Sequence, residues 1–224
     1  MAKTNPPTAA DIGFAEMFKG LSQAQLEELA DHSERITLAR GDVLFREDDT
    51  PDRLYIVVAG RIGMVNRSVD GRESMVSLME TGDLFGEMPL FDGRRRSTDA
   101  RALERSELVA VGYEPLRTLY ASDPDQLWSV VEMLASRLRV MDGVLADSVF
   151  LDVTGRTAKR LLEIAGDSDD FALPVTQEEL AGMVGASRER VNKSIASFVK
   201  LGWLEQTERR YHIANRAQLE LRAR

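Results

Sequence analysis

The stretch TQEELAGMVGASRERVNKSIASFVKLGWLE, residues 176–205, determines how the C-terminal third of the chain folds. Its first four residues have the spacing of a capping box, which predicts a helix that ends at Gly185, where a tight turn needs a residue without a β-carbon. Ser187 can cap a second helix over residues 188–201, whose predicted buried face is Val191, Ile195, Phe198 and Val199. Two helices joined by a short glycine turn are typical of a helix-turn-helix.

The runs WLEQT, ERR and YHIA come next and predict a strand, a tight turn and a second strand, so the whole is a winged helix-turn-helix. Its polar residues gather at the start of the second helix, the end that enters the major groove in such proteins. An arginine can bond both acceptors of guanine, and a glutamate can accept from the amino group of cytosine. We therefore predict DNA contacts from Thr176, Gln177, Ser187, Arg188, Glu189, Arg190, Asn192, Lys193 and Arg209.

The charge distribution agrees with a nucleic-acid partner for this segment. The chain has a formal net charge of -8, but its first 152 residues carry 17 basic and 27 acidic side chains. From Val184 onward the balance reverses, with 9 basic and 4 acidic side chains. A basic segment behind an acidic body is a mild signal of nucleic-acid binding.

Residues 36–111 show a different residue pattern, which consists of short runs rich in β-forming residues: ITLA, DVLF, LYIVV, IGMV, MVSLM and ELVAVG. Glycine and aspartate turns separate these runs, which predicts a small antiparallel sandwich or roll. A capping box at Ser22 predicts a short helix that ends near Ser33, whereas residues 1–13 are polar and are expected to be mobile.

A long helix is predicted after Asp123 and Pro124, with Asp123 as its cap. Its apolar residues alternate in steps of four and three: Leu127, Val131, Leu134, Leu138, Met141 and Leu145. This seam could pack against the chain's own sheets or against the same helix of a second copy, and its narrowness favours a parallel dimer. Three domains follow from these patterns: residues 14–122, a dimerisation helix with a hinge over 123–151, and residues 152–224.

Several classes of protein are excluded by composition. The chain has no cysteine, which removes disulfides, thiol nucleophiles and iron–sulfur clusters, and its two histidines lie too far apart in sequence to form a metal motif. Without a P-loop, a dinucleotide fingerprint or a histidine acid–base group, we predict no catalytic residue and no enzyme. No apolar run reaches about 18 residues and no secretory signal is present, so a cytoplasmic protein without membrane contact is expected.

The run FLDVTGRTAKRLLEIA (150–165), the helix-turn-helix stretch and FGEMPLFDGRRRS (85–97) together resemble the Crp/Fnr family of bacterial transcription regulators. The resemblance covers about residues 14–215. It implies an α+β fold with an N-terminal antiparallel β-roll that binds cyclic nucleotides, a long dimerisation helix and a C-terminal winged helix-turn-helix. It also implies a homodimer on palindromic promoter sites, with RNA polymerase as a further partner.

In the cyclic-nucleotide-binding members of that family, FGE…RS forms a phosphate cassette. A glycine lets backbone N–H groups approach the ligand, a carboxylate accepts from the ribose hydroxyl, and an arginine followed by a hydroxyl residue holds the cyclic phosphate. The arginines at 94 and 95 would add to the positive field. The residues that match the family's ligand site are Phe85, Gly86, Glu87, Met88, Arg96, Ser97, Arg137, Met141 and Asp142.

The identity of the nucleotide stays open at this level. cAMP is the expected effector, and no covalently bound cofactor is implied. However, cAMP-responsive relatives carry hydroxyl side chains where this chain has Met141 and Asp142. Asp142 could accept from the adenine amino group or from two donors of guanine, so cGMP or a cyclic di-guanine nucleotide is an alternative. Two further alternatives are a regulator that needs no ligand and a nucleotide-sensing subunit that acts on a protein partner.

Overall fold

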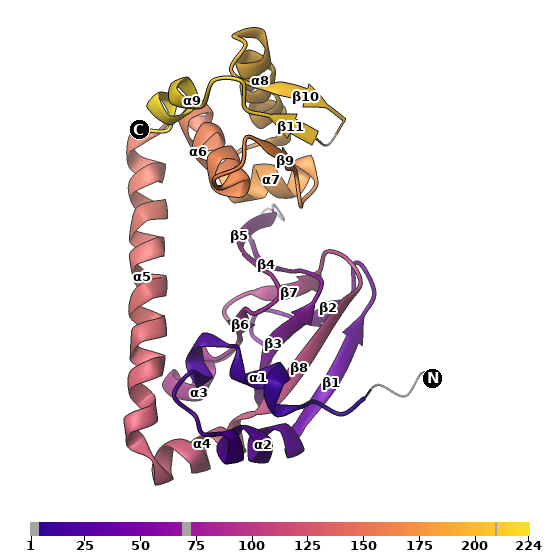
Figure 1. The fold of residues 1–224 in the computed structure, drawn as a ribbon, viewed down its shortest axis with the longest axis vertical. Coiled ribbons are helices and arrows are strands. Elements are labelled where there is room, and N and C mark those ends of the chain that lie inside the picture. The colour runs from indigo at the N-terminus through magenta and orange to yellow at the C-terminus, as the bar shows by residue number, and fades with distance from the viewer. Residues whose placement is uncertain (1–4, 69–72, 209) are drawn as a thin grey trace. The chain divides into compact units, whose positions relative to one another are not determined.

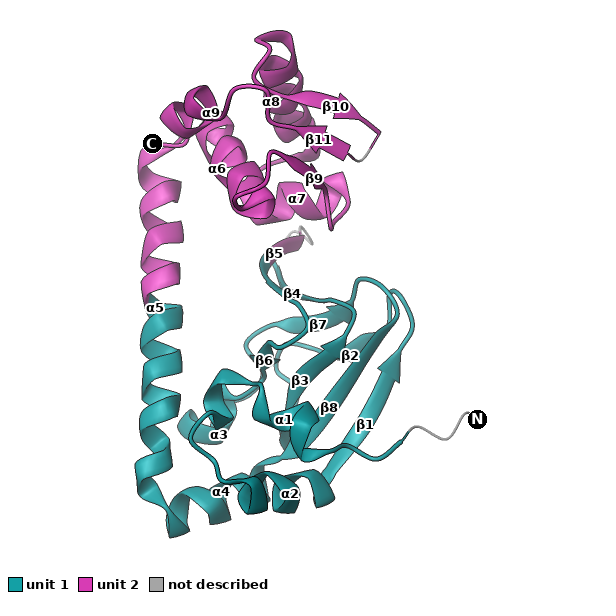
Figure 2. Cartoon of the chain, viewed as in Figure 1, with its two compact units in different colours: residues 1–68, 76–138 teal, residues 69–75, 139–224 magenta. Residues whose placement is uncertain are grey.

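The structure is a computed structural model that describes residues 5–68, 73–208 and 210–224. The chain divides into two compact units, residues 1–68 with 76–138 and residues 69–75 with 139–224 (Figure 2). The division falls inside the long helix, between Leu138 and Arg139. Among the described residues, none of the helices combines the length and the apolar character that crossing a bilayer requires.

The predicted antiparallel β-roll is confirmed: two four-stranded sheets form it, and all but residues 73–75 of β5 belong to the first unit (Figure 1). The first sheet has the order β1-β8-β3-β6, formed by Ser33–Leu38, Ser106–Gly112, Arg53–Ala59 and Leu84–Phe85. The second has the order β2-β7-β4-β5, formed by Val43–Phe45, Asp99–Ala102, Ile62–Arg67 and Glu73–Met79.

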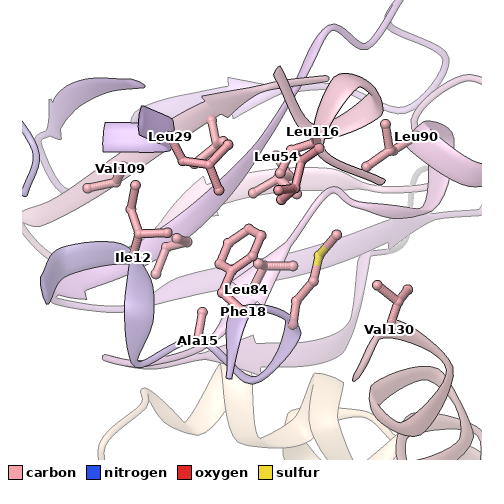
Figure 3. Close-up of a cluster of buried hydrophobic side chains, with 14 of the residues drawn as sticks. Ile12, Ala15, Phe18, Leu29, Leu54, Leu84, Leu90, Val109, Leu116 and Val130 are labelled. Carbon is pink, nitrogen blue, oxygen red and sulfur yellow. The ribbon is translucent and has the colours of Figure 1, made fainter. Parts of the chain in front are cut away.

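Alternation along β3 explains how the first sheet supports two apolar clusters. Leu54 and Ile56 face one cluster, and Tyr55 and Val57 face the other, because successive side chains of a strand point to opposite faces. The first cluster, drawn in Figure 3, packs the sheet against helices. These helices are α1 (Ala9–Gly13), η1 (Glu16–Phe18), α2 (Gln23–Asp31), α3 (Met88–Asp92), α4 (Tyr113–Ser122) and the start of α5.

The N-terminal segment is more ordered than the sequence predicted. The predicted helix after Ser22 is confirmed, and Ser22 and Gln25 form its capping box. The expectation that residues 1–13 are mobile is wrong for α1, where Thr8 and Asp11 form a second capping box. The reason is burial, since Ile12 is 0% exposed in the core. Residues 1–4 lie outside the described part of the chain.

The long helix α5 spans Leu127–Phe150, but its start differs from the prediction. A 3-10 turn over Pro124–Gln126 precedes it, and Asp123 does not cap a backbone N–H. Instead its carboxylate accepts from the side-chain amide of Gln126 at 2.9 Å. The side chains that α5 buries are Val130 and Met133, whereas the seam residues Val131, Leu134 and Leu138 are 51%, 37% and 61% exposed. Within the first unit, Leu127 at the start of the seam packs against the first apolar cluster, whereas the later seam residues are left exposed.

The second unit contains the predicted winged helix-turn-helix. Its helices and strands are α6 (Val153–Ala165), β9 (Asp170–Ala172), α7 (Gln177–Val184), α8 (Arg188–Lys200), β10 (Glu205–Thr207), β11 (Arg210–His212) and α9 (Arg216–Arg222). The three strands form one sheet in the order β10-β11-β9. Neither β9 nor α9 was predicted. Val199, expected to be buried, is 40% exposed because the buried stripe follows Val191, Ile195 and Phe198 and leaves the next position outside.

Candidate ligand site and nucleic-acid interface

The cassette forms where β6 ends and β7 begins. Gly86 follows β6 with a φ of +77°, a left-handed conformation that glycine adopts without strain. A β-carbon at this position would lie only 2.6 Å from Nη1 of Arg96. Gly86 is thus required both by its backbone conformation and by the guanidinium group that lies against it.

Arg96 is the central charged group of the cassette, and it is only 4% exposed. Nη1 donates to the Gly86 carbonyl oxygen at 2.9 Å and to the Tyr113 hydroxyl oxygen at 3.2 Å, and Nη2 donates to the Arg53 carbonyl oxygen at 2.6 Å. The carbon Cζ lies 4.2 Å from the centroid of the Phe45 ring, a cation–π contact. No carboxylate of the described residues forms an ion pair with this side chain. Arg96 therefore holds a buried positive charge that no described carboxylate neutralises.

Glu87 is also buried, at 3% exposed, and it pairs with the long helix. Its Oε1 lies 2.6 Å from Nη1 of Arg137. Arg137 also donates through Nη2 to the carbonyl oxygen of Leu84. This arrangement brings together two residues that the sequence assigned to the ligand, although here Arg137 contacts the carboxylate that was expected to hold the sugar. The formal charges of Glu87, Arg96 and Arg137 sum to +1, which suits a monoanion.

An aromatic group lies beneath the cassette. The rings of Phe45, Tyr55 and Phe85 stand 5.5 to 6.1 Å apart, centroid to centroid. Tyr113 donates its hydroxyl to the Gly86 carbonyl oxygen at 2.5 Å, and burial raises the pKa of Tyr113 to about 12 although nearby Arg96 opposes this. Sequence analysis missed Phe45, Tyr55 and Tyr113 because all three lie outside the motif in sequence, Tyr113 by the smallest separation, 17 residues from Arg96.

The other predicted ligand residues are placed as follows. Phe85 is 1% exposed within the aromatic group, whereas Met88 and Ser97 are exposed beside it. Met141 and Asp142 are exposed on the part of α5 that belongs to the second unit. The neighbouring Arg94 and Arg95 are exposed, and Nη1 of Arg95 donates to the Asp48 carbonyl oxygen at 2.7 Å.

The helix-turn-helix forms with the caps that the sequence predicted. Thr176 and Glu179 make a capping box at the start of α7, and Gly185 ends the helix with a φ of +67°. Ser187 caps α8 by accepting from the backbone N–H of Arg190. Arg156 secures the turn, because its Nε donates to the Val184 carbonyl oxygen at 2.9 Å.

The predicted DNA contacts fall into three groups. Exposed side chains crowd the first turns of α8: Ser187, Arg188, Glu189, Arg190 and Lys193. Thr176, Gln177 and Asn192 are half-buried, and the Oδ1 atom of Asn192 is buried without a hydrogen-bond partner. Arg209 lies outside the described residues, and its neighbour Arg210 is exposed at the start of β11. The exposed group presents three cations and a carboxylate at one helix end, which can reach phosphates and base edges.

A β-roll with an unpaired buried cation, joined to a winged helix-turn-helix, defines the class of ligand-responsive DNA-binding regulators. Comparison with known proteins agrees with this class. A family profile described as "Cyclic nucleotide-binding domain" matches residues 35–123, and one described as "Crp-like helix-turn-helix domain" matches residues 155–222. The chain belongs to the CRP/FNR family of transcription regulators, and it is a cyclic-nucleotide-binding, DNA-binding member of it.

Three relatives illustrate the range of the family. The chain is 36% identical to the "CRP-like cAMP-activated global transcriptional regulator" of Mycobacterium tuberculosis, over 94% of this chain and 97% of the relative. It is 29% identical to the "cAMP-activated global transcriptional regulator Vfr" of Pseudomonas aeruginosa, over 79% and 87% of the two chains. Among solved structures, the "c-di-GMP Responsive Global Regulator CLP" of Xanthomonas campestris is 25% identical with a TM-score of 0.75, covering 86% of this chain and 99% of that one.

Proposed function

We propose that the chain is a homodimeric transcription regulator whose binding to palindromic promoter sites is controlled by cAMP. The observation that carries this proposal is the buried Arg96, whose charge no described carboxylate neutralises. A buried charge is costly unless it is paired, so the cassette favours an anionic ligand. The phosphate of a cyclic nucleotide supplies one negative charge beside Arg96, and the ribose hydroxyl of the same nucleotide can donate to Glu87.

The choice of cAMP rests on relatives that are named for activation by cAMP, among them the one 36% identical over 94% of this chain. A cyclic di-guanine nucleotide is the second candidate, favoured by the name of the Xanthomonas relative and by Asp142. Its second phosphate would need a further cation, and Arg94 and Arg95 are exposed next to the cassette. The two candidates therefore differ in whether these arginines contribute to binding.

Calorimetry with cAMP, cGMP and cyclic di-GMP tests the proposal. We expect Arg96→Gln to weaken cAMP binding at least about tenfold, because hydrogen bonds to a charged group contribute about 1.5–3 kcal/mol. Arg94→Gln removes the same charge two residues away and should change cAMP affinity less than about twofold.

Other results of the calorimetry would either identify a different effector or contradict the cassette assignment. If cyclic di-GMP binds best and Arg94→Gln weakens it, the effector is the dinucleotide. If Arg96→Gln still unfolds cooperatively on heating and binds cAMP as well as the wild type does, the cassette assignment is wrong. Binding of none of the three nucleotides would contradict a cyclic-nucleotide effector.

The dimer and its DNA site follow from exposed surfaces. The seam of α5 presents Leu138, Met141 and Leu145 at 61%, 68% and 64% exposure, and a second copy of the helix is the partner that its heptad spacing fits. A symmetric dimer reads symmetric half-sites, so we propose recognition helices one DNA turn, about 34 Å, apart. Arg188 and Glu189 suit a G·C pair in each half-site.

RNA polymerase is the partner that we propose for the DNA-bound dimer, and the cytoplasm is the compartment in which it acts. The support for both is the family and its role in transcription. A protein target in place of DNA is less favoured, because the Crp-like helix-turn-helix profile covers the segment that carries the exposed cations of α8.

A further inference from the structure

Helix α9, which was not predicted from the sequence, is hydrogen-bonded through its first residue to the turn that follows α6. Arg216 donates through Nε to Asp169 at 2.8 Å, through Nη1 to the Gly166 carbonyl oxygen at 3.0 Å and through Nη2 to the Ser168 carbonyl oxygen at 2.8 Å. These acceptors form the turn that follows α6. Leu219, in the middle of α9, is 0% exposed. One end of α9 is thus anchored at the C-terminal end of α6.

The last residue of α9 forms an ion pair at the opposite, N-terminal end of α6. Nη2 of Arg222 lies 2.5 Å from each carboxylate oxygen of Asp152. Asp152 is the N-cap of α6 and accepts from the backbone N–H of Gly155 at 2.8 Å. The bond from Gly155 and the pairing with Arg222 both lower the pKa of Asp152, so the carboxylate is charged at neutral pH.

The approach of α9 to α6 is close at this end. A β-carbon on Gly155 would lie 3.1 Å from the carbonyl oxygen and from Nη1 of Arg222. A side chain at this position would require Arg222 to shift by a few tenths of an ångström. Gly155 therefore leaves room for Arg222 in the position from which it pairs with Asp152.

The ion pair lies at the connection between α5 and α6. Residues 150–152 link the two helices at the end of the segment predicted as dimerisation helix and hinge, and further bonds hold this link. Nη1 of Arg156 donates to the Leu151 carbonyl oxygen at 2.8 Å, and Lys159 of α6 pairs with Asp147 of α5 at 2.5 Å. Residues 139–150 of α5 accordingly fall in the same compact unit as the winged helix-turn-helix.

We propose that α9 acts as a clamp, which means that it holds the end of α5 and the winged helix-turn-helix together. Arg222 is the positioning residue of this clamp, and the two parts then respond to the ligand as one body. The inference rests on the proposed function. A change that the ligand causes in α5 reaches α8 through residues 150–153 and the contacts around them, so a looser connection there transmits less of the change. The pair is partly exposed, with 32% of the Arg222 side chain and 63% of the Asp152 side chain accessible. Its loss should therefore cost little folding stability while it reduces coupling.

The test is the coupling ratio, defined as the DNA dissociation constant without cAMP divided by that with saturating cAMP. It is measured by fluorescence anisotropy on one palindromic duplex at fixed salt. We expect Arg222→Gln to lower this ratio at least threefold, while cAMP affinity in the absence of DNA changes less than twofold. Arg222→Lys keeps the charge but loses the bond to both oxygens, and should lie in between. Gly155→Ala pushes α9 away with Arg222 intact, and should also lower the ratio.

Arg224→Gln is the matched control, because this exposed arginine lies two residues further on and no described partner holds it. It should keep the wild-type ratio. If Arg222 instead contacts a DNA phosphate, Arg222→Gln would weaken DNA binding equally with and without cAMP. The ratio would then stay unchanged, which would overturn the clamp. An equal fall in Arg224→Gln would also overturn it. If the wild type itself shows a ratio of one, the proposed function fails and the clamp fails with it.

Discussion

At the scale of single residues, Arg96 shows how the fold orients a buried guanidinium group. Neutral oxygens of Gly86, Arg53 and Tyr113 orient its guanidinium, and the Phe45 ring covers one face. Dipoles and rings fix the direction of the donors without cancelling the charge, which is why we propose this side chain as the anion-binding group. An arginine paired to a buried carboxylate would lack this property.

Tyr113 provides a test at the same scale through the pH dependence of stability. Its pKa is about 12 in the folded protein and about 10 when unfolded, so only the unfolded chain releases the proton between these values. The free energy of unfolding should therefore fall as pH rises from about 10 towards 12, by up to about 1.4 kcal/mol per pH unit for this residue. Urea denaturation at several pH values measures the slope. Tyr113→Phe should show a shallower fall than the wild type, and parallel curves would contradict the burial of the hydroxyl.

The motif identified Gly86, Glu87 and Arg96 from sequence, but it could not identify what holds them. Tyr113 lies 17 residues from Arg96 and Arg53 lies 43 residues away, and no local pattern links such positions. The pairing of Glu87 with Arg137 spans 50 residues for the same reason. Contacts between distant segments depend on strand pairing and helix packing, which single-sequence patterns do not fix.

At the scale of elements, α5 carries two different faces. Val130 and Met133 pack into the core of the first unit together with Leu127, whereas the seam from Val131 to Leu145 stays exposed. Exposed apolar residues in a continuous strip are costly unless a partner covers them. The element therefore favours a second copy of itself.

Leu138→Glu tests this role of α5. A charge at the seam should convert the dimer to monomer at micromolar concentration, since burying an unpaired carboxylate opposes association. Val140→Glu is the matched control, because Val140 is similarly exposed, at 66% against 61%, but lies off the seam. Sedimentation velocity gives the answer. A dimer that survives Leu138→Glu, or dissociates equally with Val140→Glu, would show that the seam is not the interface.

Elements with strong local signals were predicted, and elements without them were not. Capping boxes marked α2 and α7, and heptad spacing marked α5. Helix α9 was missed because it has only seven residues and buries one of them, Leu219, so its sequence shows no repeated apolar spacing. Strand β9 has three residues, and its partner β11 lies about 40 positions further along the chain.

At the scale of the whole molecule, the cassette and the winged helix-turn-helix lie in separate units, and the predicted ligand residues Met141 and Asp142 belong to the second. The cassette lies in the first, the winged helix-turn-helix in the second, and α5 runs through the boundary at residues 138 and 139. The charge is divided in the same way, with an acidic body and a basic C-terminal segment. Such a division concentrates attraction for DNA at α8 and the wing, while the body repels the phosphate backbone. Regulation then requires that α5 transmit the occupancy of one unit to the other.

The measurement that tests this account most directly is DNA affinity with and without nucleotide. Fluorescence anisotropy is recorded at fixed salt on the tightest palindromic duplex recovered from a random library, with a scrambled duplex as control. We predict that saturating cAMP lowers the dissociation constant for the palindrome at least about tenfold and leaves the scrambled duplex nearly unchanged. Equal affinity for the palindrome with no nucleotide, cAMP, cGMP or cyclic di-GMP would contradict the claim that a ligand at Arg96 controls DNA binding.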